Sequence, residues 1–474
     1  MEIHRETQRE AQRIEIDSLG QRTLPADALF GIHSLRASEN FRYSGETLAN
    51  YPRLVRWLAK TKMVIAIVNG RNDKLTTEQS DAIVLACLEL AAGQHTQALI
   101  VDALEGACGT SMNMNINEVI ANRALQLMGH NPGQYQFLDP LDHVAYAQST
   151  SDVLLTATKL ALIEEVSELV DTVKHLGVSL RKKELQYRDL LRVARTCMQD
   201  CMPMHLGQAF GGYAGLTERL AQSLQAHLDL FSVLPIGGTG IGTGLGTYPG
   251  YRQAVVAELS ALAGRALYPS ANLFDAIQNM DVFAALSSTV KTAALSLGKV
   301  ANDLILLSSG PHAGLNELRM VPVQAGSSMM PGKVNPVHAM GLVQTAYFVT
   351  GLDHSVSLAA ANGRLETNDY MPLIAVSLFK SIRTLAAAIS SFDRHCVQLL
   401  TANEEVCMTH LLDSIAIAPT LKQQLGYKRA AQLVEQSLRS GRTAIEIAIE
   451  EGVMSRQQII GVLHQSSLHP DVSA

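Results

Sequence analysis

The chain has 474 residues, of which 47% are hydrophobic and 17% are charged. This length allows a large core and exceeds what one compact domain usually holds, so we expect two or three domains. The formal net charge of −6 argues against non-specific nucleic-acid binding, which needs a basic surface. The low charged fraction also indicates that part of the surface is hidden in subunit contacts.

The N-terminal segment from Met1 to Glu15 is polar, with no apolar run typical of a signal peptide. The sequence contains no continuous run of 18 apolar residues, so a membrane span is not expected. Six scattered cysteines are too few for a disulfide framework and are typical of a reducing compartment. We therefore expect a cytoplasmic protein that binds neither nucleic acid nor membrane.

Long helices are the dominant local signal. Three segments of 25 residues or more carry apolar residues at spacings of three and four, without proline beyond the first position: Asp152–Leu180, Asp281–Leu307 and Pro336–Ala361. Helices of this length must cover one another's apolar faces, which predicts a bundle. Because strand-like alternation is scarce, the expected fold class is mainly all-α.

Glycine- and proline-rich segments divide the chain. A boundary falls at Asn131–Asp142, and Leu234–Tyr251 and Ser309–Asn335 are predicted loops. A further break near Asp393 precedes shorter amphipathic segments. We predict an N-terminal helical domain at 1–142, a central long-helix domain at 143–393 and a small helical domain at 394–474.

The segment Gly326–Pro336, GSSMMPGKVNP, is the most informative for chemistry. It is a serine-bearing loop followed by a lysine, an asparagine and a proline that suits the first turn of a helix. The helix N-terminus, Lys333 and the Asn335 amide would together bind a carboxylate. Positive potential there would also stabilise a serine alkoxide. A glycine-serine surface loop without chemistry is the alternative interpretation.

This segment resembles the signature GSSxMPxKxN of the aspartase/fumarase superfamily. Further segments resemble other motifs of that family in the same order along nearly the whole chain, and they lean toward the aspartases. These segments are Gly31–Ala37, Gly109–Val119, Asp142–Val144 with Gln148–Asp152, Arg195–Asp200 with Leu206–Gln208, Gly314–Leu318 and Thr401–Glu405.

The resemblance implies a homotetramer whose active sites each draw on three subunits, without a metal or organic cofactor. It implies that Ser327 is the general base that removes a proton beside one carboxylate of a small dicarboxylate substrate. The resulting enediolate would be held by Thr110, Ser149, Thr150 and Ser328. The other carboxylate would be held by Lys333, Asn335 and Thr196. Donors aimed at the developing charge are the largest expected contribution to such a reaction.

Three positions depart from the family pattern. Ser151 stands where the family usually has asparagine, Cys197 where it has histidine, and Met340 where it has the glutamate that pairs with that histidine. Loss of both members of a charge pair leaves no buried carboxylate unpaired. In aspartases the asparagine and histidine contact the departing amino group, so Ser151 and Cys197 would line an altered leaving-group pocket.

The predicted reaction is an anti β-elimination from an aspartate-like, substituted succinate to give fumarate. The favoured enzyme class is a carbon–nitrogen lyase. Whether the leaving group is free ammonia stays open. The alternatives are an ordinary aspartate ammonia-lyase, a fumarate hydratase and a catalytically weak structural homologue.

Two other motifs are interpreted as structural. Cys197 and Cys201, with His205 nearby, lack the further ligands that a zinc site needs. Gly240-x-Gly242-x-Gly244 follows no predicted strand and lacks the lysine of a phosphate-binding loop, so it is predicted to be only a turn-rich loop.

Overall fold

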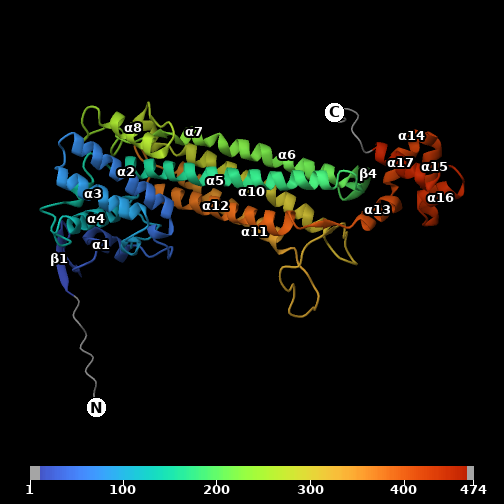
Figure 1. Cartoon of the computed structure of the whole chain (residues 1–474), viewed down its shortest axis with the longest axis horizontal. Coiled ribbons are helices and arrows are strands. Elements are labelled where there is room, and N and C mark those ends of the chain that lie inside the picture. The colour runs from blue at the N-terminus through green and yellow to red at the C-terminus, as the bar shows by residue number, and fades with distance from the viewer. Residues whose placement is uncertain (1–10, 467–474) are drawn as a thin grey trace, which may run out of the picture. The chain divides into compact units, whose positions relative to one another are not determined.

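The computed structural model describes residues 11–466, which are mainly α-helical, and this confirms the expected fold class. Most of the polar segment Met1 to Glu15 lies outside the described residues. The three predicted long helices are present as α5 (Thr150–Gln186), α10 (Asp281–Leu307) and α11 (Val337–Ala361). Two more long helices are α6 (Leu206–Gln225) and α12 (Met371–Phe392), all drawn in Figure 1.

The described chain forms two compact units that are discontinuous in sequence. The first contains residues 11–169, Ser223–Lys291 and Phe348–Arg383, and the second contains Val170–Gln222, Thr292–Tyr347 and residues 384–466. The divisions fall within the long helices. The predicted domains are continuous segments instead, so their boundaries stay a prediction.

The first unit is built on three packed helices and two small sheets. The helices are α2 (Pro52–Arg71), α3 (Thr77–Ala91) and α4 (Thr110–Leu127), preceded by α1 (Ile32–Asn40). Strands β1 (Gln12–Asp17) and β2 (Gly20–Pro25) pair antiparallel, and β5 (Val233–Leu234) pairs parallel with β6 (Tyr268–Pro269). Short helices complete it: α7 (His227–Phe231), α8 (Tyr251–Ala263) and α9 (Leu273–Gln278).

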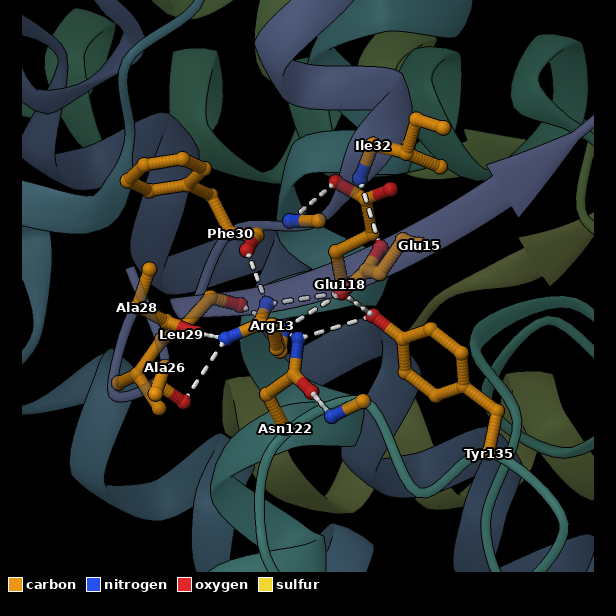
Figure 2. A network of polar contacts seen from close by, with 12 residues as sticks. Arg13, Glu15, Ala26, Ala28, Leu29, Phe30, Ile32, Glu118, Asn122 and Tyr135 are labelled. Atoms are coloured by element: carbon orange, nitrogen blue, oxygen red, sulfur yellow. Dashed lines mark hydrogen bonds and ion pairs between the residues drawn. The ribbon is translucent and has the colours of Figure 1, made fainter. Parts of the chain in front are cut away.

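A buried carboxylate joins two of the family-like motifs in this unit. Glu118 of α4 is 1% exposed and accepts hydrogen bonds from the Gly31 amide at 2.8 Å and the His33 amide at 2.9 Å. Nearby, Glu15 accepts from the Ile32 amide and the Tyr135 hydroxyl, as Figure 2 shows. The two carboxylates therefore satisfy the free amides at the start of α1 and hold it against α4.

The second unit has its own core at the C-terminal end of the chain. Antiparallel strands β3 (Leu191–Thr196) and β4 (Gln199–His205) form a hairpin, and Leu191 and Val193 pack into a cluster of apolar side chains from the last helices. Those helices are α13 (Glu404–Asp413), α14 (Ala418–Leu425), α15 (Tyr427–Ser440), α16 (Ala444–Glu450) and α17 (Arg456–Ser466). The base of the hairpin is thereby fixed.

The remaining elements are short. Strands β7 (Leu318–Arg319) and β8 (Thr401–Ala402) pair antiparallel. Single-turn helices are η1 (Leu48–Asn50), η2 (Thr96–Ala98), η3 (Pro140–Val144), η4 (Asp393–Val397) and η5 (Ile415–Ile417). Between α10 and α11 the chain contains only β7, which agrees with the predicted loop.

One described helical segment, Met371–Val397, is long and apolar enough to cross a membrane by composition alone. More than half of its most apolar window is buried inside the protein. Core helices pass the same test, so this segment is weak evidence for a membrane span.

Candidate active site

The ten residues expected at the site fall into two groups, one in each unit. The first unit holds Thr110, Ser149, Thr150 and Ser151, and the second holds Thr196, Cys197, Ser327, Ser328, Lys333 and Asn335. The chemical roles of these residues stay predictions.

In the first group, the starts of α4 and α5 lie against each other. The Nδ2 atom of Asn113, in the first turn of α4, donates to Oγ1 of Thr150, the first residue of α5, at 3.1 Å. Gly109 caps α4 with a φ of 84°, and a Cβ there would lie 2.3 Å from Cδ2 of Leu154. Glycine suits this left-handed, crowded position, which brings the start of α4 against Thr150.

The N-termini of two helices, each with partial positive charge and free amides, therefore lie close together. Thr110 is exposed there, while Ser149, Thr150 and Ser151 are half-buried. Hydroxyl donors beside neighbouring helix N-termini are suited to bind an anion such as a carboxylate.

Behind these hydroxyls lies Asp152, which is fully buried. Its Oδ1 accepts from the Ser149 amide, and its Oδ2 accepts from the amides of Gly237 and Thr239, all at 3.0 Å. Burial raises the pKa of this carboxyl to about 7, although the amide donors oppose the shift. Asp152 thus fixes the start of α5 to the glycine-rich segment that follows β5.

Lys62 of α2 is a second buried group near these hydroxyls. Its Nζ donates to Oε1 of Gln148 at 3.0 Å, and burial lowers its pKa to about 7. Sequence reasoning missed this residue. The available signal was weak: Lys62 directly precedes the apolar run Met63–Val68, but Lys60 and Thr61 beside it make the position look exposed.

In the second unit, the signature loop closes on itself. The Gly326 amide donates to the Lys333 carbonyl at 3.0 Å, and Nδ2 of Asn335 donates to the Gly326 carbonyl at 2.8 Å. A Cβ on Gly326 would lie 2.5 Å from that Lys333 oxygen, so glycine is required. Asn335 therefore holds the loop shut with its amide, and Lys333 and Ser328 remain exposed.

Ser327 is set apart from Ser328, the other hydroxyl residue of this loop, by its hydrogen bonds. Its Oγ accepts from the backbone amides of Met329 at 3.1 Å and Met330 at 3.2 Å. Donors to an oxygen favour its charged form. This geometry would stabilise the alkoxide that a serine general base requires.

Thr196 and Cys197 lie where the β3–β4 hairpin turns. Thr196 pairs with Gln199, so Cys197 and Met198 form a two-residue turn with φ values of 51° and 64°. Such turns favour Asn and Gly, and left-handed φ costs other residues about 1–3 kcal/mol. The turn exposes Cys197 in this chain.

Strand β3 of this hairpin is joined to the segment before the signature loop by Glu317, which is fully buried. Its carboxylate lies 2.7 Å from Nη1 of Arg195 and 3.0 Å from Nη2 of Arg192, both on β3. Nδ1 of His410, on α13, lies 3.1 Å from Oε1 of Glu317. The sequence places Glu317 in a family-like motif, but nothing local reveals its partners.

The hairpin does not assemble a recognisable metal site. Nε2 of His205 lies 3.2 Å from Nδ1 of His464. Within residues 11–466, no group of three or more His, Cys, Asp or Glu side chains is arranged to hold a metal ion.

Comparison with known proteins agrees with these motifs. The family described as Lyase matches residues 20–351. The aspartate ammonia-lyase of Pseudomonas aeruginosa is 40% identical over 454 residues, which are 96% of each chain. A fumarate lyase:delta crystallin from Brucella melitensis, solved bound to cobalt, has a TM-score of 0.93 and 38% identity, covering 97% of this chain and all of that one. A class II fumarase from Schistosoma mansoni has a TM-score of 0.90 and 30% identity, covering 97% of this chain and 99% of that one.

Proposed function

This chain belongs to the aspartase/fumarase family of lyases, and from that premise we propose that it eliminates an amine from an aspartate-type substrate to give fumarate. The observation that carries the proposal is the meeting of the starts of α4 and α5. Thr110, Ser149 and Thr150 surround that point, and Asn113 links the two helices. A carboxylate bound there gains negative charge when its neighbouring carbon loses a proton, and fixed donors stabilise that charge.

Ser327 is the proposed general base. Its alkoxide would be stabilised by the Met329 and Met330 amides, which already donate to Oγ. The proton taken from the carbon moves to Ser327, the carbon–nitrogen bond breaks, and the electron pair leaves with the amine. General base catalysis of this kind contributes about 10²–10⁴ in rate.

Lys333 and Thr196 are proposed to bind the second carboxylate, together with the N–H of the Asn335 amide that is not used to hold the Gly326 carbonyl. Ser328 is proposed to assist at the enediolate. The two groups of residues would be completed by neighbouring subunits of a homotetramer, as the family resemblance implies. A tetramer and a cytoplasmic location both stay proposals.

The identity of the leaving group divides two versions of this proposal. Relatives named aspartate ammonia-lyase favour release of ammonia. Ser151, Cys197 and Met340 favour a larger or less basic amine, because the shorter hydroxyl and the weak thiol are poorer partners for ammonium. Each poorer partner would weaken the binding of the ammonium group by about 1–3 kcal/mol. Ser151 and Cys197 together would therefore reduce aspartate turnover by roughly two to four orders of magnitude.

The test is fumarate absorbance with aspartate and N-substituted aspartates, together with the reverse reaction of fumarate with a panel of amines. Reaction of any panel member supports the lyase proposal, and absence of all reaction contradicts it. Rapid aspartate turnover, on the order of 10 s⁻¹ or more, would exclude the altered-leaving-group version.

The triple variant Ser151→Asn, Cys197→His, Met340→Glu provides the matched comparison. It should gain ammonia release if the three replacements reshaped the pocket. The single variant Met340→Glu is the control, since it adds a carboxylate without its imidazole partner. Equal aspartate turnover in wild type and the triple variant would contradict the altered pocket.

A further inference from the structure

The segment from Pro235 to Thr247, here called the glycine loop, has no role in the mechanism above. It is nevertheless held firmly beside the proposed enediolate site. Asp152 binds the amides of Gly237 and Thr239 with one carboxylate oxygen and the Ser149 amide with the other. The same buried side chain therefore fixes the position of the glycine loop relative to Ser149.

The glycine loop also carries its own internal bonds. The amides of Gly242 and Gly244 both donate to the Gly238 carbonyl, at 2.9 and 3.1 Å. Thr239, 6% exposed, adopts a left-handed φ of 55° where its amide reaches Asp152. Such a conformation persists only where the surroundings enforce it, so the loop has a defined shape.

Gly240 is the point at which this loop faces the Ser149 hydroxyl. A Cβ built on Gly240 would have one neighbour within 4 Å among the described residues, Oγ of Ser149 at 4.0 Å. The φ of Gly240 lies outside the left-handed region, unlike that of Gly242 at 109°. Neither backbone conformation nor crowding within the chain therefore requires glycine at 240.

We propose that Gly240 determines substrate specificity by leaving space beside the Ser149 hydroxyl. That space would accept a methyl-sized substituent on the substrate carbon next to the carboxylate that Ser149 binds. The inference rests on the proposed function, because it takes the role of Ser149 from there. It extends the substrate class to aspartates that carry a methyl-sized substituent at C3, whose elimination gives a methyl-substituted fumarate.

The probes are aspartate and both diastereomers of 3-methylaspartate. Their amino group is on C2, so the methyl-bearing carbon, C3, is next to the C4 carboxylate. Each is measured as a competitor of the chain's best substrate, so no turnover of the probe is needed. The variant is Gly240→Ala. The matched control is Gly461→Ala in α17, another glycine with open space and an unstrained φ.

In wild type, one diastereomer should bind within about threefold of aspartate. Gly240→Ala should weaken that diastereomer at least tenfold relative to aspartate, since a methyl group in a fitted pocket is worth about 10–200-fold. Gly461→Ala should leave the ratio unchanged.

An unchanged ratio in Gly240→Ala, or exclusion of both diastereomers by wild type, would overturn this inference while elimination from unsubstituted substrates stays intact. Failure of every substrate, with no dicarboxylate bound, would instead overturn the proposed function and this inference with it.

Discussion

Replacing Glu317 by glutamine should destabilise the second unit severely. Glu317 is fully buried, and the side chains of Arg192 and Arg195 that pair with it are only 7% and 13% exposed. The amide keeps the shape of the side chain but removes the charge that both guanidinium groups share. Breaking a buried ion pair on one side costs about 3–5 kcal/mol, because the remaining charge is left desolvated.

The assay is the free energy of unfolding from urea denaturation, compared with that of wild type. Glu218→Gln is the matched control, because its partner Arg181 is 46% exposed and such surface pairs are worth about 0–1 kcal/mol. Glu317→Gln should also raise the KM for the dicarboxylate, since Thr196 lies on the strand that Glu317 holds. A loss of less than about 1 kcal/mol in Glu317→Gln would refute the claim that this carboxylate neutralises both arginines.

Three further predictions concern the lysine proposed to bind the second carboxylate, a buried lysine and the oligomeric state. Lys333→Ala should weaken dicarboxylate binding by about 2–5 kcal/mol in calorimetry, and unchanged affinity would mean that the proposed substrate orientation is wrong. Burial lowers the pKa of Lys62 to about 7, so between pH 7 and about 10.5 the unfolded lysine holds a proton that the folded one lacks. The free energy of unfolding of wild type should therefore rise with pH in that window relative to that of Lys62→Met. If the two free energies changed with pH in parallel, the lowered pKa of Lys62 would be contradicted. Light scattering at micromolar concentration should give about four times the 51.2 kDa chain mass, with a monomer contradicting the shared-site proposal.

The long helices were predictable because their signal is repeated over many turns. α10 has the same bounds as the predicted segment, and α5 and α11 begin within two residues of theirs. The β3–β4 hairpin was not predicted. Its turn uses Cys197 and Met198 in left-handed conformations, where sequence reasoning looks for Asn or Gly.

Part of the candidate site was predictable because some of its residues lie in contiguous motifs. Motifs along the chain identified Thr110, Ser149 and Ser327, since each lies in a contiguous segment with a recognisable pattern. Side chains that act across long sequence separations gave no such signal. Lys62 lies 86 residues from Gln148, and Glu317 lies more than 120 residues from the arginines that it binds.

Turnover by Ser327→Ala tests the central claim most directly. The variant is measured with the best substrate found for wild type, after light scattering and circular dichroism have verified assembly and fold. Ser328→Ala provides the neighbouring comparison within the same loop. The account predicts a loss of about 10²-fold or more in kcat for Ser327→Ala, because no other group in that loop has an oxygen held by two amides. Near-normal turnover in Ser327→Ala would contradict the assignment of this serine as the base.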